Sequence, residues 1–336
     1  MSPLDRLRIR LGPSARRWRR RLDNPEVSQA RALVHRLRSG PLDVLHLGAS
    51  ESLFVAPYDE DGRTLPAMVA DGLAPDLSMY SLVGASYHPR LYQAYLEVVA
   101  TYPVRPVVVL GLCIRFGFPP WSHHPEYSFE RSLRALDRID PHAAPWRFRA
   151  GVPLATADDF VRHDQVAYPT LDETRATIGE FRNQLKDPEA AGLSREEQVR
   201  GLYAFHHGST ASLPDPFLAD VTRLGRRLQE MNLAAVVYQL PVPVARGSQV
   251  LGEALRSQTI ENLARMDRAF ADGYGPIDIL QTGVLLDEDE FIDPTDATEH
   301  VNQRGRQRIA DLIVGAVHES RRLPATPPPA PGTPAG

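Results

Sequence analysis

The chain has 336 residues, of which 43% are hydrophobic and 24% charged, enough for a full globular core in one large domain or two small ones. The net charge of −4 gives no overall attraction to nucleic acid, so we expect no nucleic-acid partner. The only cysteine, Cys113, excludes an intramolecular disulfide framework and a multi-cysteine metal site. No apolar run approaches the ~20 residues of a membrane span, and no apolar stretch follows the basic N-terminus. The sequence therefore predicts a cytoplasmic protein.

Both ends of the chain differ in composition from its middle. Residues 1–38 are rich in arginine and predict a basic helical extension, whereas the Pro- and Ala-rich residues 321–336 predict a disordered tail. The arginines within 6–21 have two interpretations. They make weak contact with an anionic membrane surface, at ~1 kcal/mol per charge, or they form an arm that is solvated or packed on the domain. Residues 39–320 are predicted to form one domain.

Between the ends, buried strands alternate with amphipathic helices. Short apolar runs rich in β-branched residues predict strands at 43–48, 77–82, 106–112, 234–241 and 277–282. Apolar residues at helical spacing predict helices at 91–98, 217–231 and 309–317. This alternation is typical of a three-layer α/β/α fold with a mostly parallel, five-stranded, flavodoxin-like sheet. In such sheets the functional site lies at the carboxyl ends of the strands.

Two residues near predicted element ends are candidates for chemistry. Ser50 follows the first strand in the segment LGASES, where its hydroxyl can face a ligand. The alternative is that Ser50 or Ser52 caps the following helix. Near the other end of the chain, His300 precedes the last helix, with carboxylates three to seven residues upstream, as expected for a base held in one tautomer by an acid.

The order of these motifs resembles that of the SGNH (GDSL-like) hydrolase superfamily. Gly48-Ala49-Ser50 is similar to the family's first motif, Gly84 falls at the glycine of the second, and the segment from His300 to Gly305 is similar to the last. The resemblance covers roughly residues 43–112 and 277–318. It implies that Ser50 attacks an ester carbonyl, that His300 takes and returns the proton, and that the N–H groups of Ser50 and Gly84 hold the oxyanion. No cofactor is expected.

Two positions depart from the family pattern. The asparagine that donates to the oxyanion is replaced by Cys113, so this contact is either lost or replaced by Arg115. The acid is out of register, because the position three residues before His300 is Ala297. Asp296 is the first choice for the residue that orients His300, and Asp293 is the second.

A long segment after the third strand, at about 118–213, is predicted to be an insertion that serves as a lid or acceptor-binding surface. Its aromatic residues either line that surface or form a satellite core, namely Trp121, Tyr127, Trp146 and Phe148. The histidine pairs at 123–124 and 206–207 lack the carboxylate spacing of a metal site, so no metal is predicted.

Three functions follow from the sequence. The first is a serine esterase that acts on a small or carbohydrate-linked ester through an acyl-enzyme on Ser50. The second is an O-acyltransferase that uses the same serine with a sugar or another alcohol as acceptor. The third is a catalytically impaired SGNH-like binding protein, an interpretation that Cys113 leaves open.

Overall fold

The computed structural model of this chain describes residues 25–122, 124, 129, 157–169, 175–189, 191–208 and 211–322. The arginine-rich segment 6–21 and the aromatic residues Tyr127, Trp146 and Phe148 lie outside these ranges. Of the predicted tail 321–336, residues 323–336 also lie outside, whereas 321–322 end the last helix and do not belong to a tail. Within the described ranges, no helix combines the length and the apolar character needed to cross a membrane.

A parallel sheet of four strands forms the centre of the protein. The strands are β1 (Val44–Gly48), β2 (Met79–Val83), β3 (Val107–Leu112) and β6 (Ala235–Gln239), in the order β2-β1-β3-β6. Every pairing is parallel. Valine and leucine fill β1 and β3, and both strands are buried along their whole length, as expected for strands covered by helices on both faces.

The predicted fifth strand, 277–282, is not a strand of this sheet. It pairs with β6 only through an isolated parallel bridge between Tyr238 and Leu280. Beyond that bridge the Thr282 N–H donates to the Leu280 carbonyl, and the Thr282 hydroxyl binds the Gln239 carbonyl. The segment thus stays beside the end of β6 without forming a regular ladder, so the predicted five-stranded sheet has four strands in the structure.

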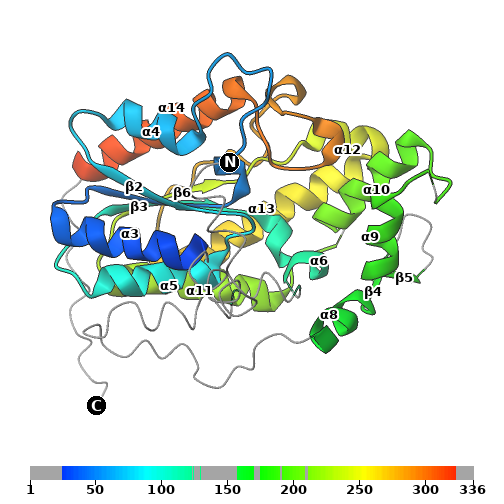
Figure 1. Cartoon of the computed structure of the whole chain (residues 1–336), viewed down its shortest axis with the longest axis horizontal. Coiled ribbons are helices and arrows are strands. Elements are labelled where there is room, and N and C mark those ends of the chain that lie inside the picture. The colour runs from blue at the N-terminus through cyan, green and yellow to red at the C-terminus, as the bar shows by residue number, and fades with distance from the viewer. Residues whose placement is uncertain are drawn as a thin grey trace, which may run out of the picture.

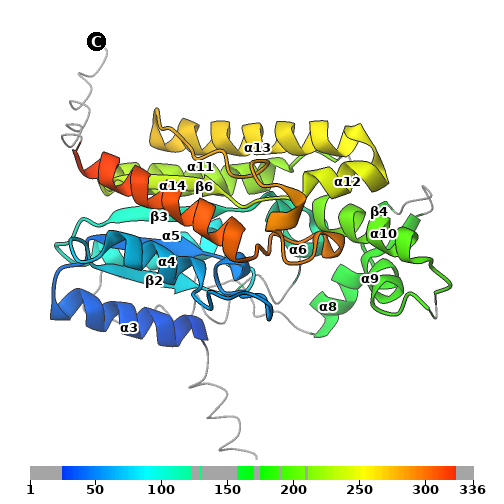
Figure 2. The ribbon, with the colours of Figure 1, turned by 90° about the horizontal axis from the view of Figure 1, so that it is seen from above.

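Helices cover both faces of the sheet and give three layers (Figure 1). One face carries α4 (Leu65–Leu73) and α14 (Gln303–Arg322). The other carries α3 (Pro25–Ser39), α5 (Pro89–Ala100) and α11 (Asp215–Glu230). The long helix α13 (Glu253–Tyr274) runs beside α11, as Figure 2 shows, and α12 (Val244–Leu251) precedes it.

Residues 25–38, which the sequence assigned to the basic extension, belong to the packed domain. They form α3, which buries Leu33 completely and Leu37 almost completely in the main hydrophobic core. The α/β domain therefore begins before residue 39, and only residues before 25 remain for the predicted extension.

The segment after β3 builds a small subdomain beyond one end of the sheet, next to α6 (Pro119–Ser122) (Figure 1). Its described elements are η2 (Ile114–Gly117), α8 (Ala157–Asp164), β4 (Ala167–Pro169), β5 (Arg175–Thr177), α9 (Ile178–Lys186) and α10 (Arg195–His207). Capping boxes start α9 at Thr177 and α10 at Ser194. A satellite core that includes Phe181 and Phe205 joins β4, β5, α9 and α10, and Trp121 packs against it. Of the two interpretations of the aromatic residues, an acceptor surface or a satellite core, the satellite core therefore applies to Trp121.

The contact between α11 and α13 depends on glycine. A Cβ atom on Gly273 would overlap the backbone of Thr222, and one on Gly225 would lie 2.6 Å from the Phe270 carbonyl oxygen. Backbone atoms cannot move aside as side chains do, so each glycine sets how closely the two helices approach.

We predict that Gly273→Ala lowers the free energy of unfolding by about 1–3 kcal/mol, because the helices must separate. Gly315→Ala is the matched control, since Gly315 lies in α14 and a methyl group added there would meet no atom of a neighbouring element within 4 Å. Alanine there raises stability by up to about 1 kcal/mol. Urea unfolding of both variants measures the difference, and a Gly273→Ala variant as stable as the wild type would contradict this account of the helix contact.

Candidate active site

Three chain segments meet at the carboxyl ends of the central strands. β1 ends at Gly48 and leads into a short 3-10 helix, η1 (Ser50–Ser52). Because Gly48 is paired with Val83, the residue after β2, Gly84, lies beside this turn. A Cβ on Gly84 would overlap the Tyr87 ring, so the close contact between the backbone at position 84 and this ring requires glycine. The turn with Ser50 and the predicted second oxyanion donor thus occupy the same edge of the sheet.

Ser50 and His300 meet although 250 residues separate them in the sequence. The distance from the Ser50 Oγ to the His300 Nε2 is 3.4 Å, a loose hydrogen bond of the kind common in ligand-free sites. Helix η1 has Ala49 as its N-cap and no side-chain capping bond, so neither Ser50 nor Ser52 serves as its cap. The Ser52 hydroxyl is instead fully buried and donates to Glu51.

Packing rather than a hydrogen bond holds the His300 ring. The Phe54 ring stacks on the imidazole with centroids 3.8 Å apart and an interplanar angle of 23°. Burial lowers the pKa of His300 to about 4; the nearby Glu299 carboxylate opposes this shift and the Arg115 charge adds to it. The imidazole is therefore neutral at physiological pH, and its Nε2 can accept a proton from Ser50.

Neither predicted aspartate is hydrogen-bonded to His300. Asp293 caps the short helix η5 (Pro294–Asp296) by accepting from the Thr295 N–H at 2.8 Å and from its hydroxyl at 2.6 Å. Asp296 is exposed at the end of η5, and partial desolvation of its carboxyl group together with the Asp293 charge raises its pKa. Among the described residues, the His300 side chain has one hydrogen-bond partner, Ser50. Neither aspartate therefore makes the expected contact with the imidazole: Asp293 binds Thr295 within its own turn, and Asp296 forms no hydrogen bond to His300.

Glu299, directly before the histidine, binds both residues that the sequence proposed for the oxyanion hole. The carboxylate is 1% exposed; it accepts from the Cys113 Sγ at 3.4 Å and pairs with the Arg115 Nη2 at 2.7 Å. The Arg115 guanidinium also lies 4.6 Å above the Trp121 ring. Arg115 and Cys113 therefore tie the end of β3 to the His300 loop through Glu299. The sequence signal for Glu299 was its position beside the histidine.

Helix α10 braces the loop that leads to His300. Ala297 adopts a left-handed conformation, with φ of 54°, and its carbonyl accepts a 2.8 Å hydrogen bond from the His207 Nε2. The Tyr203 hydroxyl lies 2.7 Å from the Pro294 carbonyl, and Arg195 donates to the Thr295 hydroxyl at 2.8 Å. The segment after β3 thus fixes, by hydrogen bonds, the loop that leads to His300, the predicted base.

A buried ion pair joins the loop after Ser50 to the start of α14. The Arg306 and Asp59 side chains are 0% and 1% exposed, and Arg306 Nη1 lies 2.8 Å from Asp59 Oδ2. Arg306 also donates to the carbonyls of Val301, Asp61 and Arg63.

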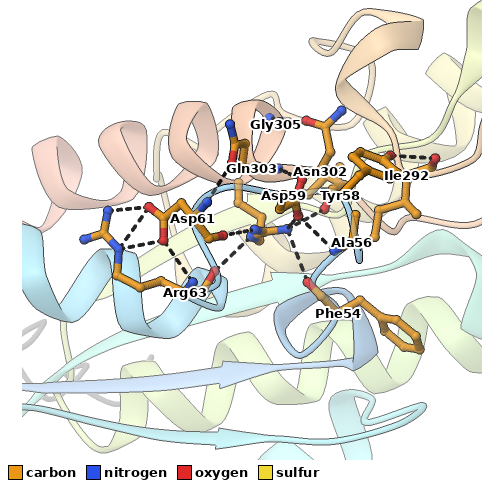
Figure 3. A network of polar contacts seen from close by, with 12 residues as sticks. Phe54, Ala56, Tyr58, Asp59, Asp61, Arg63, Ile292, Asn302, Gln303 and Gly305 are labelled. Carbon is orange, nitrogen blue, oxygen red and sulfur yellow. Dashed lines mark hydrogen bonds and ion pairs between the residues drawn. The ribbon is translucent and has the colours of Figure 1, made fainter.

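The backbone on both sides completes this network. Figure 3 shows Asp59 and Gln303 bonded to one another's segments: the Gln303 N–H donates to Asp59, and the Asp61 N–H donates to the Gln303 side chain. On the outer side the Tyr58 hydroxyl donates to the Ile292 carbonyl at 2.9 Å. The loop that carries Phe54 is thereby fixed to the segment that carries His300.

No group of three or more histidine, cysteine or acidic side chains is arranged to hold a metal ion in the part of the chain that the structure describes. No protein-family model matches the chain, and no curated protein matches it.

We predict that Arg306→Met lowers the free energy of unfolding by about 3–5 kcal/mol, because it leaves Asp59 buried without its cation. Arg304→Met is the control: Arg304 lies in the same helical turn, but its pair with Asp289 is exposed at 63% and 65%, so its loss should change stability little. Denaturant unfolding of both variants tests this. Equal stabilities for the two variants would show that the buried pair is not an anchor.

Proposed function

We propose that this protein is a serine ester hydrolase of the SGNH type, with Ser50 as the nucleophile and His300 as the general base. The observation that carries the proposal is the 3.4 Å approach of the Ser50 hydroxyl to the His300 Nε2 at the carboxyl ends of a parallel sheet. A serine hydroxyl is a weak nucleophile until an adjacent base removes its proton. The low pKa of His300 keeps that base in its neutral form.

The reaction follows from these two groups. As the Ser50 Oγ bonds to the ester carbonyl carbon, its proton passes to the His300 Nε2, and the carbonyl oxygen takes the negative charge. The N–H groups of Ser50 and Gly84 are the donors proposed for that oxygen. When the carbon–oxygen bond breaks, His300 returns the proton to the departing alcohol. Water, activated by the same histidine, then hydrolyses the acyl-serine.

The surroundings of the pair favour a small, apolar ester. Leu53 and Phe54 directly follow η1 and are 45% and 47% exposed, and the Phe54 ring lies against His300. Exposed apolar side chains on an anchored loop beside a nucleophile are suited to contact a short acyl or aryl group.

A catalytically impaired, ligand-binding protein is the second candidate, and a specific observation favours it. Cys113 and the Arg115 Nη2 both contact Glu299, which leaves the backbone N–H groups of Ser50 and Gly84 as the donors proposed for the hole. Loss of one oxyanion donor costs ~3 kcal/mol, about a hundredfold in rate. The neutral His300 also has no hydrogen-bonded carboxylate to stabilise the imidazolium that forms in the reaction.

The decisive test is labelling with a fluorophosphonate, together with hydrolysis of p-nitrophenyl acetate. We expect wild type to be labelled on Ser50, and Ser50→Ala and His300→Ala to lose both labelling and turnover. Ser320→Ala, far along α14, serves as the control that retains both. We expect Cys113→Asn to gain up to about a hundredfold in turnover, because it restores a side-chain donor. Wild-type turnover and labelling no higher than those of Ser50→Ala would favour the binding protein.

The pH dependence provides an independent check on His300. The base works only when neutral, so kcat/KM should fall as pH drops through the His300 pKa of about 4 and be insensitive to this group above about pH 5. An acidic limb centred near the ordinary histidine value of about 6.5 that persists in Glu51→Gln, where the buried carboxyl group with a pKa of about 7 is removed, would contradict the buried, neutral imidazole. Steady-state kinetics in buffers of constant ionic strength from pH 3 to 9 measure the limb.

A further inference from the structure

A buried carboxyl group lies directly behind the candidate nucleophile. Glu51 is 1% exposed, and its Oε1 receives three donors. These are the Ala49 N–H at 3.1 Å, the Ser52 hydroxyl at 2.8 Å and the Tyr238 hydroxyl at 3.3 Å. The other oxygen, Oε2, is buried without a hydrogen-bond partner among the described residues. Two of the three donors come from the residues on either side of the Ser50–Glu51 step, so this one oxygen closes the turn.

A chain of hydrogen bonds leads to Glu51, in which His46 donates to Tyr238 and Tyr238 donates to Glu51. The Nδ1 of the fully buried His46 has no partner in the described structure, and its Nε2 lies 3.1 Å from the Tyr238 hydroxyl. An unpaired buried N–H costs more than an unpaired lone pair, so the proton belongs on Nε2 and is donated to Tyr238. Tyr238 can then donate its own proton to Glu51. A side chain on β1 and one on β6 are thus linked to the turn.

The side chains of this network lie close to the backbone of Gly48. A Cβ on Gly48 would lie 3.3 Å from both the Glu51 Oε1 and the His46 Nε2 and would overlap the Ser52 hydroxyl. The network therefore packs directly on the end of β1. Ala49 joins this network through its backbone N–H, which donates to Glu51, because its side chain has no polar atom.

We propose that Glu51 is a positioning residue for the nucleophile: its carboxyl group holds the 49–52 turn so that the Ser50 hydroxyl faces His300. This inference rests on the proposed function, because it assigns Glu51 a role in that same reaction. Glu51 touches neither His300 nor any reacting atom and acts through the backbone of the turn.

The charge of Glu51 should make this support depend on pH. Burial raises the pKa of Glu51 to about 7, although the hydrogen bonds from Ser52 and Ala49 lower it and the Glu299 charge raises it further. Titratable groups from several elements surround it: His46 on β1, Tyr92 on α5, Cys113 at the end of β3, Tyr238 on β6 and Glu299 in the loop before α14. Burial keeps His46 neutral and raises the pKa values of Tyr92, Cys113 and Tyr238, so none of these four gains charge near neutral pH. As pH rises through 7, Glu51 becomes an anionic acceptor and its bonds to the turn strengthen.

The experiment compares Glu51→Gln and Glu51→Met with wild type by the rate of fluorophosphonate labelling of Ser50 from pH 5 to 9. Glutamine keeps a carbonyl acceptor for Ala49, whereas methionine fills the space without one. We expect Glu51→Met to label about a hundredfold more slowly, as expected for a nucleophile that is misplaced by about 1 Å. Glu51→Gln should stay within about threefold of wild type at pH 6 and lack the rise near pH 7. Glu60→Gln, an exposed neighbour on the following loop, is the control that keeps the wild-type profile.

A second readout does not depend on activity. Amide hydrogen exchange at Ala49 should be at least tenfold faster in Glu51→Met than in wild type, at matched global stability, because the N–H loses its acceptor. If wild type is never labelled, the proposed function fails, and the exchange rates still test the positioning role. Wild-type exchange at Ala49 in Glu51→Met would overturn the inference, as would wild-type labelling with an unchanged pH profile in both Glu51 variants.

Discussion

The geometry of the candidate site depends on one buried guanidinium. Arg306 is completely enclosed, and burial of such a charge is tolerable only when a counter-ion and hydrogen-bond acceptors surround it. Asp59 supplies the counter-ion, and the backbone carbonyls of Asp61, Arg63 and Val301 supply further acceptors. These acceptors come from two chain segments that lie far apart in the sequence. The loop after Ser50 and the start of α14 are therefore fixed to one another, and the distance between Ser50 and His300 follows from that connection.

His300, the proposed base, is held differently from the histidine of a hydrogen-bonded triad. Phe54 stacks on one face of the ring, and α10 fixes the preceding loop through the Ala297 carbonyl. Glu299 anchors the backbone beside His300 to the end of β3 through Arg115. Packing can orient an imidazole as firmly as a carboxylate, but it adds no charge to stabilise the imidazolium. The proposed site therefore combines a well-positioned imidazole with a low pKa.

The sequence predicted the elements that depend on local pattern. The Val- and Leu-rich runs that became β1, β3 and β6 could be recognised because strands buried on both faces must be continuously apolar. The order of motifs also placed Ser50 and His300 at one sheet edge, where the structure brings them together. Helix α13 was missed, although Leu255, Met266 and Phe270 lie on one buried face at helical spacing. The fifth strand was predicted from apolar character alone, which does not reveal that the Thr282 backbone turns back on itself.

The choice of the supporting acid could not be made from spacing. Asp293, Asp296 and Glu299 all lie within seven residues of His300, and a count of positions cannot include the left-handed turn at Ala297 between them. That turn changes the direction of the chain after η5. Only Glu299, beyond it, has its carboxylate buried beside the site. The role proposed for Glu51 was hidden for a related reason, since its partner Tyr238 lies on a strand 187 residues away in the sequence.

The hydrogen bonds from α10 to the loop before His300 make the segment after β3 an inseparable part of the molecule. Insertions in α/β domains are commonly regarded as modules that can be exchanged to change specificity while the core remains intact. Here His207, Tyr203 and Arg195 of that segment each bond to a residue of the loop that precedes His300. A homologue that shortened or replaced this segment would have to find another support for the base. A redesign that grafts a new subdomain must therefore carry these three anchors with it.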